Sequence, residues 1–253
     1  MKKNIRIDLI LIYYIIAVVL SMFFRVPRLN PGWYASLPDY PNGWILYSLL
    51  RASGPFVGGL IAIWFFRNKY QQTISLAGNQ PVISLIYFFI PVIMIALMGI
   101  PGNSGDNNHV HGLLTGLVLM TYCLFEETGW RGFLMDAMRG ISNPFRFIII
   151  GTLWYLWHLN FISAQDAASL KFGLLVHLPS CILGSWIIGL MADKYSSLMV
   201  AAAIHSVFNI FFDLGTDMKS KVIIAVGVFS VWIIGSKIVE RNQKTNETIE
   251  PNK

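Results

Sequence analysis

Three apolar stretches of this chain contain polar side chains of the kinds that carry out hydrolysis. The first stretch has two adjacent carboxylates and an arginine, the second a histidine, and the third a histidine and an asparagine: Glu126, Glu127 and Arg131, then His158, then His205 and Asn209. An ionisable group near the middle of a membrane helix costs about 2.5–3.5 kcal/mol on insertion scales. We therefore expect these groups to face one another or a wet cavity instead of lipid.

Helix periodicity predicts how these side chains are distributed. Residues four apart share a helix face, so Glu127 is expected to pair with Arg131, and His205 to lie beside Asn209. Glu126 lies about 100° around the helix from Glu127. It is therefore predicted to be an unpaired carboxylate that points elsewhere.

Two kinds of hydrolytic site can be built from this set. A carboxylate and an imidazole can activate water while an amide and a second imidazole donate hydrogen bonds to an oxyanion. Alternatively, one carboxylate and two imidazoles suffice as ligands of a catalytic zinc with an open position, the candidates being Glu126, His158 and His205. Structural uses compete with both, as an ion pair or as hydrogen bonds between helices. The coincidence of all six residues in membrane helices favours a functional site.

The composition indicates the class of protein that must position these residues. The chain has 253 residues, of which 55% are hydrophobic and 13% charged, with a mean hydropathy of +0.58. Soluble domains carry about 25% charged residues, so a membrane protein is indicated. The net charge of +6 does not indicate nucleic-acid binding, because the positive residues fall at the ends of apolar segments.

We predict an all-α fold, a polytopic membrane bundle of about eight transmembrane helices. Residues 1–111 would form three helices with loops, 112–213 the core that carries the polar set, 214–239 the last helix, and 240–253 a disordered polar tail. Lysine and arginine favour an arrangement with both termini cytoplasmic. The predicted helices are 7–24, 44–66, 81–100, 112–135, 146–164, 172–191, 196–213 and 221–239.

The polar set also resembles a known family signature. Glu126-Glu127-x-x-x-Arg131, then Trp154-x-x-x-His158, then His205-x-x-x-Asn209 is similar to the three motifs of the CPBP (Abi) intramembrane proteases, over roughly residues 112–213. That family includes the type II CAAX prenyl endopeptidases and bacteriocin-processing or bacteriocin-immunity proteins. Its second motif usually begins with phenylalanine, where this chain has Trp154.

The resemblance implies an intramembrane endopeptidase that cleaves a membrane-associated or lipid-modified peptide. Glu126 and His158 would activate water, His205 and Asn209 would hold the oxyanion, and Glu127 and Arg131 would support them. The family has been described both as metalloproteases and as glutamate-dependent proteases, so zinc is a candidate cofactor. The expected partners are the peptide substrate and the lipid bilayer, with no nucleic acid. The expected location is the bacterial cytoplasmic membrane.

Two other functions compete with proteolysis. One is a non-catalytic bacteriocin-immunity or scaffolding protein of the same fold. The other is a proton-coupled transporter, against which no inverted repeat is visible. Several further polar residues are interpreted as structural: Arg51 within a helix, Tyr122 beside the carboxylates, and His177 and Cys181 in the sixth segment.

Overall fold

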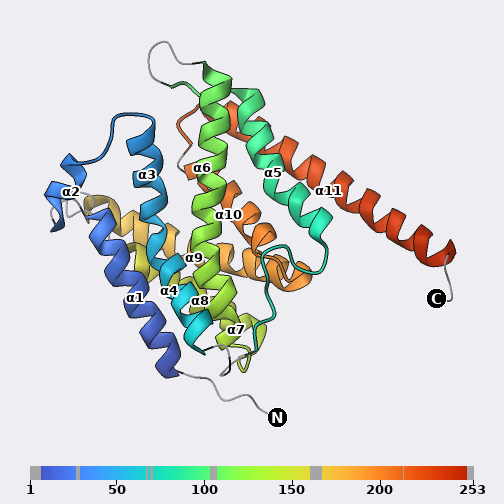
Figure 1. Ribbon diagram of the computed structural model, residues 1–253, viewed down its shortest axis with the longest axis horizontal. Coiled ribbons are helices and arrows are strands. Elements are labelled where there is room, and N and C mark those ends of the chain that lie inside the picture. The colour runs from blue at the N-terminus through green and yellow to red at the C-terminus, as the bar shows by residue number, and fades with distance from the viewer. Residues whose placement is uncertain are drawn as a thin grey trace.

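Long apolar runs with few helix breakers form helices along most of the described chain (Figure 1). The computed structural model describes residues 7–26, 29–66, 68, 71–102, 107–159, 167–212 and 214–249, without the side chains of 167–175 and 242–249. No strand occurs in these ranges, so the predicted all-α class is confirmed. The elements are α1 (Ile7–Arg25), α2 (Pro31–Ala35), α3 (Asn42–Arg51), α4 (Ser53–Phe66), α5 (Pro81–Met98), α6 (Asn108–Gly129), η2 (Trp130–Leu134), α7 (Met135–Ala137), α8 (Asn143–Leu159), α9 (Ala167–Tyr195), α10 (Leu198–Phe212) and α11 (Met218–Ile249).

Four of the described helices are long and apolar enough to cross a membrane, and a bent pair makes a fifth. They are α1, α5, the Val176–Tyr195 part of α9, the Met218–Arg241 part of α11, and the pair α3–α4. The chain is therefore an integral membrane protein, but by this criterion it has fewer complete spans than the eight predicted. The helix α10, which lies within the predicted span 196–213, has 15 residues. It is about 22 Å long, less than the roughly 30 Å hydrocarbon core of a bilayer.

Two predicted boundaries are corrected. The segment 44–66 is not one straight helix: it breaks at Ala52 into α3 and α4, which are bent by 53°. Pro55 explains the break, since it has no N–H to donate to the carbonyl of Arg51 four residues earlier. At the other end, α11 continues to Ile249, so 240–249 is helical instead of a disordered tail. The last residues of that predicted tail, 250–253, and those of the predicted helix 146–164, 160–164, lie outside the described ranges.

The short helix α10 lies inside the bundle, in contact with α5, α6, α9 and α11. Every residue from Leu198 to Val207 is buried. In Figure 1, α10 passes behind α6, and α11 extends away from the other helices at its C-terminal end. Since α10 has protein on its sides, the polar residues that it carries face other helices instead of lipid.

Glycines allow close approach where helices cross next to the polar residues. A side-chain carbon added at Gly59 of α4 would lie 2.9 Å from the Cα of Gly129, the last residue of α6. One added at Gly151 of α8 would lie 2.6 Å from the Cα of Ile182 on α9. Small residues let helix backbones pack tightly in membrane proteins. These crossings bring α6 and α8 into fixed positions against their neighbours.

A network of charged side chains joins the ends of three helices. Arg139, just after α7, is 2.6 Å from Asp136 and 2.9 Å from Asp193 near the end of α9. Arg146, at the start of α8, is 2.6 Å from the other oxygen of Asp193. The α7–α8 link and the α9–α10 link therefore lie at the same end of the bundle.

Candidate functional site

The predicted pair of Glu127 and Arg131 is present at the junction of α6 and η2. The Nη1 atom of Arg131 is 2.8 Å from Oε2 of Glu127 and 3.0 Å from its Oε1, and neither side chain is exposed. The residues after Glu127 form a π-helical turn, Trp130–Leu134. Such turns are rare and often occur at functional sites. Because a π-helical turn has hydrogen bonds between residues five apart, the side chains after the two carboxylates point in other directions than in a regular α-helix.

Glu127 also binds the predicted histidine of α10. Nδ1 of His205 is 2.8 Å from Oε1 of Glu127. A carboxylate bound to arginine accepts hydrogen bonds, so Nδ1 of His205 carries the donated proton and Nε2 remains for another partner. The motifs on α6 and α10 are therefore joined through one carboxylate.

Glu126 was predicted to be unpaired, and that prediction is wrong. Its Oε1 is 3.3 Å from Nη2 of Arg25 at the end of α1, and its Oε2 accepts a 3.1 Å hydrogen bond from the indole of Trp154 on α8. Arg25 also donates to the hydroxyl of Tyr122 at 2.6 Å and lies 4.1 Å from the centre of the Trp157 ring. The predicted helix 7–24 ends one residue before Arg25, and nothing in the sequence around Arg25 predicts its contact with Glu126.

Trp154 connects the three motifs. Besides its bond to Glu126, its ring lies 5.0 Å from the ring of His205 and 5.5 Å from the guanidinium of Arg131. Its carbonyl oxygen is 2.8 Å from Nδ1 of His158. Because a carbonyl only accepts, Nδ1 of His158 is the donor and its Nε2 keeps a lone pair. The tryptophan that replaces the usual phenylalanine of the second motif thus makes a hydrogen bond that phenylalanine does not.

The predicted catalytic residues Glu126, His158, His205 and Asn209 line one cavity of about 260 Å³, here called the central cavity. Glu127 and Arg131 lie outside its lining and contact it through His205 and Trp154. Asn209 donates a long 3.5 Å bond to the sulfur of Cys123, which is a weak acceptor. The structure also adds residues that the sequence had assigned to packing. They are Tyr122, Arg51, His177 and Cys181.

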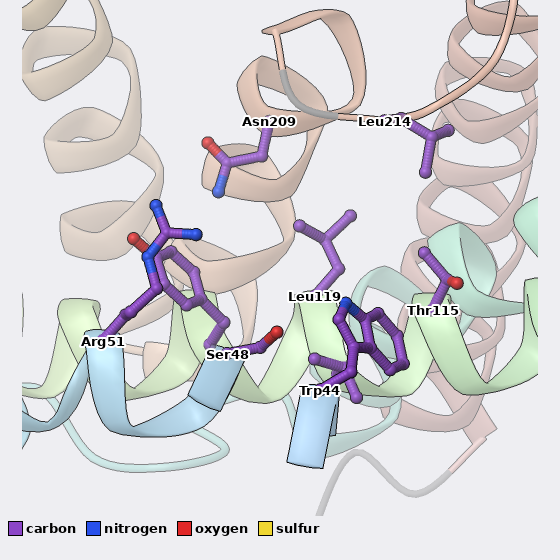
Figure 2. Close-up of a pocket in the computed structure, with 9 residues that line it drawn as sticks. Trp44, Ser48, Arg51, Thr115, Leu119, Asn209 and Leu214 are labelled. Atoms are coloured by element: carbon purple, nitrogen blue, oxygen red, sulfur yellow. The ribbon is translucent and has the colours of Figure 1, made fainter. Parts of the chain in front are cut away.

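Two further cavities share residues with the central cavity. One, of about 290 Å³, shares Arg51, Tyr122 and Asn209 with it. Figure 2 shows this cavity: the Arg51 side chain rises from α3 toward Asn209 on α10, and Trp44 and Thr115 lie on its other side. The guanidinium of Arg51, whose expected use was structural, lies 5.5 Å from the ring of Tyr47. Arg51 lines both cavities and so lies at the boundary between them.

The third cavity is apolar. It measures about 360 Å³ and shares Phe208 and Phe212 with the central cavity. Its lining is entirely hydrophobic and comes from α9, α10 and α11: Ile187, Ile204, Val207, Phe208, Phe211, Phe212 and Phe229. The central cavity and the apolar cavity therefore lie side by side and share part of their lining.

The predicted zinc ligands do not fit a shared ion. Glu126 is held by Arg25 and Trp154, and Nδ1 of His205 is directed at Glu127. Within the described ranges, the group of ligand atoms close enough to share an ion is a different one, in which His158 is joined by His177 and Cys181. We therefore derive no step of hydrolysis through a metal held by Glu126, His158 and His205.

Comparison with known proteins supports the resemblance drawn from the motifs. Residues 108–211 match the family model described as type II CAAX prenyl endopeptidase Rce1-like, a range that contains all three motifs. The chain is also 24% identical over 242 residues to CAAX prenyl protease 2 of Methanococcus maripaludis, covering 84% of this chain and 88% of that protein.

Proposed function

We propose that the chain, whose residues 108–211 match the Rce1-like family model, is a membrane protease of the CAAX type that hydrolyses a peptide bond of a membrane-associated or lipid-modified peptide. The observation that carries this proposal is the surroundings of Glu126. Its carboxylate is buried in a cavity within the bundle and held by two donors, and the same lining holds the imidazoles of His158, His177 and His205 and the amide of Asn209. Such a site can activate water and stabilise the resulting oxyanion.

Glu126 is the proposed general base. The positive charge of Arg25 favours its ionised form, and the Trp154 indole fixes its orientation. A water in the central cavity would give its proton to Glu126 as it attacks the substrate carbonyl carbon. The Nε2 lone pair of His158 would accept the second hydrogen bond of that water, because Nδ1 is occupied by a carbonyl. Glu126 then returns the proton to the leaving amine.

His205 and Asn209 are the proposed oxyanion donors. Among the described residues, the amide of Asn209 donates to the sulfur of Cys123 over a long 3.5 Å distance, a weak bond that a substrate oxyanion can replace. Nδ1 of His205 already donates to Glu127, so a proton on Nε2 would let the same ring donate to the oxyanion as well. Glu127 contacts both Arg131 and His205, so the supporting pair acts on the reaction through His205.

The three cavities suit the parts of a lipid-modified peptide. The apolar cavity would hold the lipid chain. The cavity at Arg51 would hold the part of the peptide that the cleaved bond separates from the lipid-modified residue. Burial of a lipid chain contributes about 0.8 kcal/mol per CH₂, so the apolar space can supply much of the affinity.

The test is cleavage of a farnesylated fluorogenic peptide with a CAAX terminus by purified protein in detergent or proteoliposomes. Glu126→Gln is expected to lower turnover by about 10²–10⁴-fold, as loss of a general base does. Asn209→Ala should lower it by about 10²–10³-fold. Asp217→Asn, at the exposed start of α11, is the control and keeps full activity. Unchanged turnover in both site variants would refute the assignment of Glu126 and Asn209, and a wild type without any turnover would favour the non-catalytic scaffold.

We also infer that the protein lies in a bacterial cytoplasmic membrane with both termini in the cytoplasm. The joined ends of α7, α8 and α9 carry Arg139, Arg146 and Lys194, as expected of cytoplasmic links. Reporter fusions at the C-terminus and in the α9–α10 link should give cytoplasmic signals in both cases. A periplasmic signal from either one contradicts the assignment.

A further inference from the structure

Three neighbouring side chains line one wall of the central cavity. His158 has a role in the proposed hydrolysis, and the other two, His177 and Cys181, have none. His177 and Cys181 lie one turn apart on α9, and His158 faces them from α8. Nε2 of His177 is 3.7 Å from Sγ of Cys181, and the rings of the two histidines are perpendicular, 5.2 Å apart. One ligand atom from each of the three residues lies within 4.8 Å of the other two. We call this group the His-His-Cys cluster.

The chemistry of the cluster is that of a transition-metal site. Tetrahedral zinc, with bonds of about 2.0–2.1 Å to nitrogen and about 2.3 Å to sulfur, places its nitrogen and sulfur ligands about 3.6 Å apart. The His177–Cys181 separation of 3.7 Å is close to this spacing before any adjustment. Both histidines are only partly buried, so small side-chain rotations can bring His158 nearer. Two imidazoles and a thiolate are ligands that zinc and copper prefer over magnesium or calcium.

A hydrogen bond from its other ring nitrogen holds the imidazole of His158 in place. Metal-binding histidines usually donate their other ring N–H to a carbonyl or carboxylate, which fixes the ring and its tautomer. Nδ1 of His158 donates to the carbonyl of Trp154 at 2.8 Å, which leaves Nε2 as the ligand atom. His177 is flanked by the ring of Tyr155 at 5.7 Å. The cluster thus has a fixed first ligand and two more on one helix face.

We propose that the His-His-Cys cluster binds a divalent transition-metal ion of the zinc type and that this ion inhibits the protease. The inhibition rests on the proposed role of His158. Nε2 of His158 cannot hold the attacking water while its lone pair is bound to a metal. Binding converts the Cys181 thiol to a thiolate and releases its proton to solvent. The three ligands line the central cavity, so an ion held by them would occupy space that the substrate needs.

Metal binding is tested apart from activity. Purified full-length protein, freed of metal by a chelator, is titrated with Co²⁺, which reports a thiolate ligand by its charge-transfer absorption. The chain has two cysteines, so Cys181→Ser and Cys123→Ser are matched variants. The wild type and Cys123→Ser should bind one ion with the thiolate band, and Cys181→Ser should lose that band. His177→Gln should weaken binding at least about tenfold, and it checks the site by a change that spares both thiols.

Inhibition is tested with Zn²⁺ in the peptide-cleavage assay, each variant being compared with its own metal-free rate. The half-inhibitory Zn²⁺ concentration should rise at least about tenfold in Cys181→Ser and His177→Gln and stay the same in Cys123→Ser. An unchanged cobalt spectrum in Cys181→Ser overturns the site, and binding without inhibition overturns the regulatory role. A protein that binds Co²⁺ as described but never cleaves peptide refutes the proposed function and leaves the metal site standing.

Discussion

Trp154→Phe removes one hydrogen bond from the proposed general base and restores the residue usual at this position of the motif. The indole donates at 3.1 Å to a carboxylate that is 1% exposed, so little water is available to replace it. Hydrogen bonds to charged groups contribute about 1.5–3 kcal/mol. At about 1.4 kcal/mol per factor of ten, complete loss in the transition state lowers kcat by about 10–150-fold. KM should change little, because the bond orients the base and does not bind substrate.

The control is Trp232→Phe. Trp232 is equally buried and donates at 3.1 Å to the carbonyl of Tyr87, between α11 and α5, away from the central cavity. Both variants lose a buried indole hydrogen bond, so both should lower the thermal unfolding midpoint in detergent. Only Trp154→Phe should lower kcat for the farnesylated peptide. Equal kcat values for wild type and Trp154→Phe would show that the bond to Glu126 is not used in catalysis.

Three further outcomes follow from packing and charge. Glu127→Gln leaves two buried partners without their carboxylate and should destabilise the fold by about 3–5 kcal/mol, seen as a lower unfolding midpoint together with lost cleavage. Gly151→Ala forces a carbon against Ile182 and should cost about 1–3 kcal/mol; an unchanged midpoint contradicts the close α8–α9 crossing. Hydrogen bonds from Ser220 hold the pKa of Asp217 below its usual range, so the first turn of α11 is stabilised above that range and loses this as pH falls through the lowered pKa. The protection factor of the Ser220 amide against exchange should fall only in that acidic range, and a fall near neutral pH would count against this account.

The sequence predicted the membrane class and the motif residues because both depend on local patterns. Apolar runs identify membrane helices, and four-residue spacing correctly paired Glu127 with Arg131. The same reasoning was wrong for Glu126, because its partners Arg25 and Trp154 lie far away in the chain. No spacing rule within one helix identifies a contact between α1 and α6.

Two helix boundaries were predicted wrongly, one beside a proline and one at the C-terminal end of the last helix. Pro55 is visible in the sequence, yet the apolar run around it was interpreted as a single span, since composition does not distinguish a bent pair from one helix. The length of α11 was underestimated because a polar continuation does not end a helix that has already formed.

The amino-acid sequence by itself determined that this is a helical membrane protein and which polar residues have no reason to face lipid. The tertiary structure alone decided which of them meet. It put Arg25 beside Glu126, joined His205 to Glu127, and brought His177 and Cys181 to His158 instead of the predicted zinc ligands. The physical reason is that insertion cost depends on each segment's own composition, whereas pairing depends on how separate helices cross.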